Sequence, residues 1–263
     1  MTAASRTLPD YASPPVIEVV CGVSFSPLPS PYVPFVGRFW SELGEDFKTC
    51  EEAPPLAPAV ERFDDPAEIQ VEMPLLPRVW FVNSGQDQIV QVQQDRFLCN
   101  WRKTAPEHAY PRYENVIQRF YDKLDMFAAF SAKQFQSPLQ PTQYELSYIN
   151  HIPAGAGWSD LGQLGQVVPD FAWRTSGAPR FLPLPEGADI RLAFRLPQNR
   201  GRLRVHLHNA QRRTDGVAVL LLELTARGFD SDMKRWFDLG HEWIVRGFAD
   251  LAGDGVQRLW GRK

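Results

Sequence analysis

The sequence predicts an α+β protein with an extended, mostly antiparallel sheet and two or three long helices packed on one face of it. Short runs rich in β-branched and aromatic residues alternate apolar and polar side chains, which is typical of half-buried strands. Between these runs lie segments whose apolar residues recur at helical spacing. Strands that follow one another through short turns pair as antiparallel neighbours, and this indicates the sheet type.

The first half of the chain begins with "VIEVVCGVSF" (16–25), which we expect to be a mostly buried strand. Pro34 suits the first turn of a helix, whose apolar face is formed by Val36, Phe39, Trp40, Leu43 and Phe47. The segment 49–77 is rich in proline and acidic residues, so we expect a solvent-exposed connecting loop on the surface.

Three strands and a second helix complete this half. The strands are expected at about 78–83, 88–93 and 96–102, and the helix begins near Tyr113. Phe97, Cys99 and Trp101 share one face of the third strand because side chains alternate along a strand. We therefore expect Trp101 to be buried, and we expect the same of Trp243 in the last helix.

The second half repeats this order of elements. A strand is expected at 144–152, a loop-rich region with a short helical turn at "SDLGQLG" follows, and three strands begin at "DIRLAFRL", "RLRVHLHN" and "VAVLLLELTA". A helix runs from about Asp230, and Asp230 or Ser231 is expected to cap its first turn.

The repeated order suggests an internal duplication of a β-α-βββ-α unit. The strand openings "PPVIE" and "PTQYE" and the helix segments "RFYD" and "RWFD" occupy equivalent places in the two halves. We expect a flexible tail at 1–13, a first half at 14–140 and a second half at 141–263, with the two halves packed as one cooperative unit.

Composition limits the class of protein. The chain has 263 residues, of which 44% are hydrophobic and 22% are charged, and its net charge is −3, so no overall positive charge favours nucleic acid. Its three cysteines have no metal-ligand spacing and favour a reducing compartment. The N-terminal residues resemble no signal peptide and no apolar run approaches the ~20 residues of a membrane span, so we expect a cytoplasmic protein without membrane contact.

The sequence carries no complete catalytic motif. It lacks the GxSxG elbow, the Walker loop and the kinase signature, and "GHEWIV" lacks the second histidine of HExxH because Val245 stands at that position. We therefore predict no catalytic residues, no cofactor and no tightly bound metal.

The strand "RLRVHLHN" is the first candidate binding site. Arg202, Arg204, His206 and His208 fall on one side of it, within a stretch (190–213) that holds no acidic residue. Such a face suits phosphates or an acidic protein segment. Two alternatives remain: a solvated face paired with carboxylates such as Glu223 and Asp189, or a metal site at His206 and His208 that needs a third ligand.

The second candidate lies where the strand at 96–102 leads into the following helix. Arg102, Lys103 and Arg112 form a basic rim beside aromatic residues, an arrangement that can grip phosphates.

Five segments together resemble a family of sporadically distributed bacterial proteins of unknown function. These are "PPVIEVVCGVSF", "QVQQDRFLCNWRK", "YPRYENV", "YELSYIN" and the closing "FDLGHEWIVRGFADL…LWGR", which span almost the whole chain. The resemblance implies no activity and no catalytic residues, and it implies an accessory role in a bacterial defence or toxin–immunity module.

The sequence therefore favours a non-enzymatic binding or accessory protein that recognises an acidic protein partner or a phosphate-bearing ligand. Nucleic acid and a second copy of the chain are the other partners considered. The alternatives are a metal-dependent enzyme that uses His206 and His208, and a small-ligand-binding protein with a pocket between helix and sheet.

Overall fold

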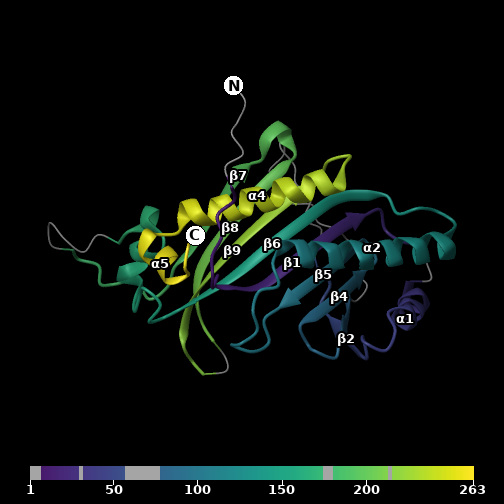
Figure 1. Cartoon of the computed structure of the whole chain (residues 1–263), viewed down its shortest axis with the longest axis horizontal. Helices are drawn as coiled ribbons and strands as arrows, with labels where there is room; N and C mark the ends of the chain where they lie inside the picture. Colours follow the sequence, from purple (N-terminus) through teal and green to yellow (C-terminus); the bar gives the residue numbers. More distant parts are fainter. Residues whose placement is uncertain (1–6, 30–31, 57–77, 174–179, 213–214) are drawn as a thin grey trace.

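A single antiparallel sheet is the centre of the molecule (Figure 1). The computed structural model describes residues 7–29, 32–56, 78–173, 180–212 and 215–263. Within them nine strands pair in the order β2-β3-β4-β5-β1-β6-β9-β8-β7. Their bounds are β1 Val16–Phe25, β2 Thr49–Ala53, β3 Arg78–Val82, β4 Gln88–Gln93, β5 Arg96–Arg102, β6 Pro141–Pro153, β7 Asp189–Arg195, β8 Gly201–Gln211 and β9 Ala218–Gly228.

Two long helices, α2 (Tyr113–Phe135) and α4 (Met233–Leu251), lie in front of the sheet in Figure 1, and the start of α2 contacts the middle of α4. Three shorter helices are α1 (Tyr32–Glu42), α3 (Leu164–Val167) and α5 (Asp254–Leu259). Phe127 of α2 stacks on Phe97 of β5, and Phe237 of α4 contacts Tyr144 of β6. Val23 of β1 pairs with both Phe97 and Tyr144, so both helices contact the same face of the sheet.

The two faces of the sheet differ in chemistry because side chains alternate along each strand. The helix-covered face carries apolar residues such as Val19, Leu222 and Val205, all of them buried. The opposite face carries mostly polar and charged side chains, and we call it the polar face. Its residues include Glu18, Asn100, Glu145, Ser147, Glu223, Thr225, Arg202, Arg204, His206 and His208.

Aromatic rings fill the space under α1 and α2. Phe39 of α1 contacts Phe127 edge to face, and Phe127 lies on Phe97. These three rings are fully buried, which explains the helical spacing of the apolar residues in both helices. The prediction that Trp40 belongs to the buried stripe is wrong: it is 37% exposed, and its indole N–H donates to the carbonyl of Phe47.

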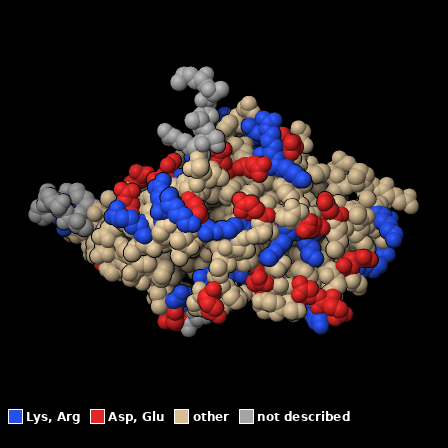
Figure 2. Space-filling model, viewed as in Figure 1, with Lys and Arg blue, Asp and Glu red and all other residues tan. Residues whose placement is uncertain are grey.

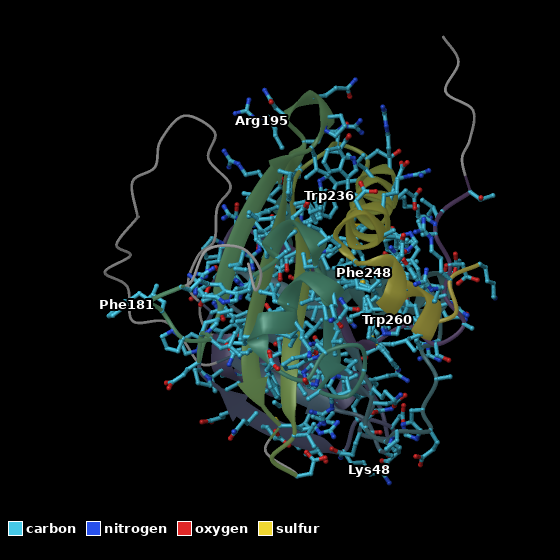
Figure 3. The ribbon with its side chains drawn as sticks, turned by 90° about the vertical axis from the view of Figure 1, so that its left-hand side faces the viewer. Lys48, Phe181, Arg195, Trp236, Phe248 and Trp260 are labelled. Atoms are coloured by element: carbon cyan, nitrogen blue, oxygen red, sulfur yellow. The ribbon has the colours of Figure 1, made fainter. Side chains whose placement is uncertain are left out.

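Helix α4 contacts the sheet through Trp236 and Phe248, which lie on its sheet side in Figure 3. Asp232 caps the helix by accepting a hydrogen bond from the Arg235 N–H. The prediction that Asp230 or Ser231 is the cap is therefore wrong, because the helix begins later. Asp230 instead pairs with Arg200. Trp243, expected to be buried, is only partly buried at the margin of the core.

The predicted strands agree closely with the structure, and two short elements were missed. Strand β2 and helix α5 lie where the sequence predicted none, while the rest of the expected connecting loop, 57–77, lies outside the described residues. The expectation of a flexible tail at 1–13 has to be restricted: Tyr11 is 5% exposed and pairs with Arg262, while 1–6 lie outside the described residues. In the described part of the chain no helix has the length and hydropathy to cross a membrane.

Candidate functional site

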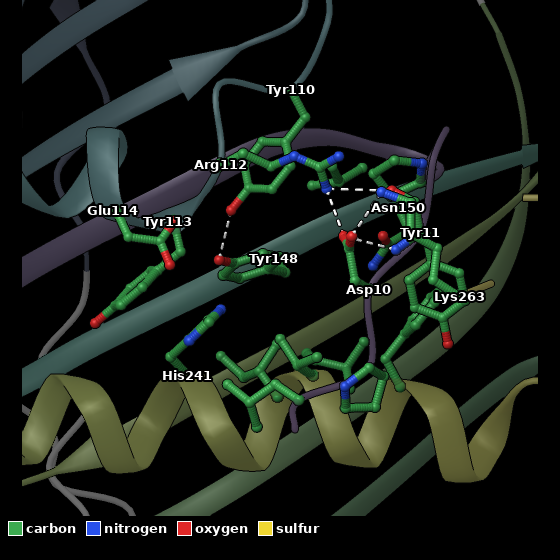
Figure 4. A pocket seen from close by; sticks show the side chains of 18 residues that line it. Asp10, Tyr11, Tyr110, Arg112, Tyr113, Glu114, Tyr148, Asn150, His241 and Lys263 are labelled. Carbon is green, nitrogen blue, oxygen red and sulfur yellow. Dashed lines mark hydrogen bonds and ion pairs between the residues drawn. The ribbon is translucent and has the colours of Figure 1, made fainter. Parts of the chain in front are cut away.

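A cavity of about 510 Å³ lies between the sheet and helix α4, close to the first turn of α2 (Figure 4). Its walls come from five parts of the chain that are far apart in sequence: residues 8–16, residues 110–114, strand β6, strand β9 and helix α4. The last residue, Lys263, also lines it. We call this cavity the central pocket, and its volume is typical of sites for small organic ligands.

Two tyrosine hydroxyls meet at one wall of the central pocket. Tyr148 lies on the helix-covered face of β6, and its hydroxyl is 2.8 Å from the hydroxyl of Tyr110. Tyr110 precedes Pro111 and contacts the ring of Trp101, which fixes its position. Burial raises the pKa of both tyrosines, so both are neutral phenols at pH 7 and can donate or accept hydrogen bonds.

A stacked pair forms the next part of the wall. The rings of Tyr113, at the start of α2, and His241, in α4, are parallel within 5° with centroids 3.7 Å apart. Burial lowers the pKa of His241 to about 4, so the imidazole is neutral at pH 7. The buried Tyr113 hydroxyl has no hydrogen-bond partner among the described residues, and Figure 4 shows it pointing away from Tyr110, Tyr148 and Asp10.

One end of the central pocket is charged. Asp10 lies between two cations: its carboxylate is 2.8 Å from Arg112 Nη1 and 3.0 Å from Lys263 Nζ. The hydrogen bond from Lys263 lowers the pKa of Asp10, and the charge of Arg112 also lowers it. Figure 4 shows Asp10 and Arg112 pointing toward each other across the mouth.

The backbone at Arg112 is strained. It has φ 73° and ψ 155°, a region that residues with a side chain rarely adopt. This conformation starts α2, and the guanidinium also donates to the carbonyl of Tyr11. Strain of this kind costs on the order of 1–3 kcal/mol and occurs often at ligand sites.

The remaining walls are apolar. The apolar lining includes Leu224, Ile244 and Phe248. Asn150 also lines the pocket, and its amide nitrogen donates to the Leu222 carbonyl. The central pocket is therefore an aromatic and aliphatic chamber with neutral hydrogen-bonding groups in its wall, the charged cluster of Asp10, Arg112 and Lys263 on one side and the carboxylate of Glu114 beside Tyr113. This combination is suited to binding a small planar molecule.

The structure distributes the predicted binding residues over three places. Arg202, Arg204, His206 and His208 are on the polar face of β8, as the alternation predicted. Arg102 is the last residue of β5 and donates to the carbonyl of Gln86, and Lys103 follows directly after the strand. Arg112 lines the central pocket on the other side of the sheet, so the predicted rim of Arg102, Lys103 and Arg112 is not one site.

The basic character predicted for the polar face is offset by carboxylates from neighbouring strands. Asp189 of β7 pairs with Arg191 and lies 3.2 Å from His206 Nε2. Glu145 of β6 pairs with Arg227 of β9. Arg213, the last residue of the predicted basic stretch, lies outside the described residues. On the helix side, acidic and basic side chains are likewise interspersed (Figure 2).

Sequence reasoning missed most of the central pocket. Tyr110 and Tyr113 stood in the stretch that was singled out, but Tyr148, His241 and Asp10 carried no local motif. A search of protein-family models, of curated proteins and of solved structures found no match to the chain.

Proposed function

We propose that this protein is a non-enzymatic binding protein whose central pocket holds a small organic molecule. The observation that carries the proposal is the cavity of about 510 Å³, in which the phenols of Tyr110, Tyr113 and Tyr148 and the imidazole of His241 surround an apolar chamber.

The walls of the pocket indicate the chemistry of the ligand. Aromatic rings and aliphatic side chains favour a planar apolar body, and the neutral hydroxyls favour a hydroxyl, amide or ring nitrogen on its edge. Arg112 and Lys263 at one end favour an anionic group such as a carboxylate, which would share these cations with Asp10. We therefore propose an aromatic or conjugated molecule with one acidic group.

The arrangement of the strands supports an origin of the pocket by duplication. We infer that the two halves are repeats, because the order β3-β4-β5-β1 on one side of the β1/β6 contact is mirrored by β6-β9-β8-β7 on the other. The central pocket lies at this contact, with Tyr110 and Tyr113 from one half and Tyr148 and His241 from the other. Small-molecule sites often lie at such junctions.

The other expected functions have less support. Recognition of an acidic partner by the polar face is disfavoured by Asp189, Glu145 and Glu223 on the same face. A catalytic role has no further support, because burial raises the pKa of Tyr110 and Tyr148 and lowers that of His241, so none of the three titrates near neutral pH. An accessory role in a defence or toxin–immunity module stays a prediction, because it rests on the resemblance alone.

Binding of 1-anilinonaphthalene-8-sulfonate tests the proposal, because this probe combines aromatic rings with one anionic group. We expect one probe per chain, with a saturable rise in fluorescence. Val245 lines the pocket from α4, and the larger side chain of Val245→Trp would fill it and reduce the affinity at least tenfold.

Leu239→Trp is the matched control, since Leu239 is partly buried in the same helix and does not line the pocket. Both variants should retain the far-ultraviolet circular dichroism of the unmodified protein. Equal binding by both variants, or binding of many probes per chain without saturation, would contradict the proposal.

A further inference from the structure

The polar face holds a second cluster, separate from the central pocket and on the other side of the sheet. His206 and His208 are two residues apart on β8, and Glu223 of β9 is paired directly with His206. One ligand atom from each of these three side chains lies within 4.8 Å of the others. In the described part of the chain, no other group of three or more His, Cys, Asp or Glu side chains lies close enough to hold a metal ion.

The ligand types suit a zinc-like ion. Two imidazoles and one carboxylate, with a position left for water, form a common zinc site. Ligand atoms bound to tetrahedral zinc at ~2.0–2.1 Å lie roughly 3.4 Å apart. The three ligand atoms already lie within 4.8 Å of one another, and all three side chains are partly exposed, so an ion can enter from solvent.

An unpartnered nitrogen independently points to a ligand. His208 Nδ1 is buried and has no hydrogen-bond partner among the described residues. Its ring stacks on that of His206, with centroids 4.3 Å apart, so the two imidazoles are held side by side. A buried polar atom without a partner is costly, and a metal bond would remove that cost.

The surroundings of the cluster support a cation. Asp189 Oδ1 lies 3.2 Å from His206 Nε2, so it can accept the N–H at that atom and leave His206 Nδ1 as the metal ligand. Arg191 of β7 is paired directly with His206, and its guanidinium donates two hydrogen bonds to the same Asp189. Glu18 of β1 lies in the same row of the polar face as Glu223, since both are paired with Ile149 of β6.

We infer that His206, His208 and Glu223 form a binding site for a divalent transition-metal ion, with Asp189 as the positioning residue for His206. The site is open to solvent on one side, so the ion would retain a water that an anionic ligand can replace. This inference is independent of the central pocket.

Titration of metal-depleted, untagged protein with Co²⁺ tests the site. We expect one Co²⁺ per chain with the visible absorption of a four- or five-coordinate ion, and displacement by one Zn²⁺. His206→Gln, His208→Gln and Glu223→Gln should each weaken binding at least a hundredfold, and Asp189→Asn about tenfold.

His108→Gln is the control, because His108 is exposed and bonded to Thr104 away from the cluster. Thermal unfolding without metal establishes that each variant folds. If a histidine variant does not fold, the result for Glu223→Gln decides the outcome. Absence of stoichiometric binding, or binding that survives the folded variants at the cluster, would overturn the inference. Equal loss in His108→Gln would overturn it as well.

Discussion

At the scale of single residues, burial determines which ionisable groups of the central pocket carry charge. His241 is held against Tyr113 where water is scarce, and its pKa falls from 6.5 to about 4. Asp10, at the mouth, has its pKa lowered instead because it accepts a hydrogen bond from Lys263. Neutral groups therefore line the inside and charged groups line the entrance.

The shift at His241 predicts a loss of stability in acid. In the unfolded chain His241 takes up a proton below about pH 6.5, whereas in the folded protein it does so only near pH 4. The unfolded state binds more protons in this window, so the contribution of His241 is fully present above pH 6.5 and is lost as the pH falls toward 4. At about 1.36 kcal/mol per unit, the loss is on the order of 3 kcal/mol.

His241→Phe keeps the ring stack and removes the titration. We expect urea denaturation to show a smaller fall in the free energy of unfolding between pH 6.5 and 4 for this variant. Other groups with shifted pKa values, such as Glu18 and Asp10, are present in both proteins and cancel in the difference. Parallel pH profiles would refute the assignment.

The two tryptophans that were both predicted to be buried differ in their burial. Trp101 is 5% exposed and contacts Tyr110, so Trp101→Ala should lower the free energy of unfolding by about 3–5 kcal/mol. Trp243 is only partly buried, and Trp243→Ala should cost about half as much. Denaturant titrations of both variants measure this difference, and equal costs would mean that the ring of Trp243 is buried as the sequence predicted.

At the scale of elements, alternation and periodicity predicted most strands and both long helices. Strand β5 was predicted with its observed bounds because Phe97, Cys99 and Trp101 recur at every second position and polar residues, Arg96 and Arg102, stand at its two ends. Strand β2 was missed because its residues, "TCEEA", are mostly exposed and acidic at the edge of the sheet. Helix α5 was missed because it has only six residues, too few for a periodic pattern.

The central pocket could not be predicted from alternation or periodicity, for a different reason. Its residues come from segments separated by more than a hundred positions, for example Asp10 from Arg112. Only the pairing of strands and the packing of helices bring them together. The third ligand at the polar face, Glu223, likewise became identifiable only from the pairing of β8 with β9.

The N-terminal segment closes one side of the central pocket, and Asp10 neutralises the cations there. In Asp10→Asn the charges of Arg112 and Lys263 lose this partner, so we expect anilinonaphthalene sulfonate to bind several-fold more tightly. The gain should shrink in 0.5 M salt, because screening weakens exposed charges. Fluorescence titration measures both effects.

Asp170→Asn is the control, since Asp170 is exposed and does not line the pocket. An unchanged or weaker affinity in Asp10→Asn would show that the cations do not contact the sulfonate group of the probe.

At the scale of the whole molecule, one continuous sheet joins the two halves. Strands β1 and β6 pair along most of their length, and their contact lies between the first-half and second-half strands. Helices α2 and α4 also meet through the Tyr113–His241 stack. We therefore expect the chain to unfold as one cooperative unit in calorimetry, with equal calorimetric and van't Hoff enthalpies; two separate transitions would contradict this.

The central place of β1 has a consequence for synthesis of the chain. Its partner β5 ends at Arg102, but its other partner, β6, ends only at Pro153. A ribosome adding ~5–20 residues per second needs a few seconds to cover that interval. During this time the nascent first half exposes the unpaired backbone of β1, an edge that attracts strands of other chains. Slow translation between these two strands should therefore increase aggregation more than a slow stretch placed after β6.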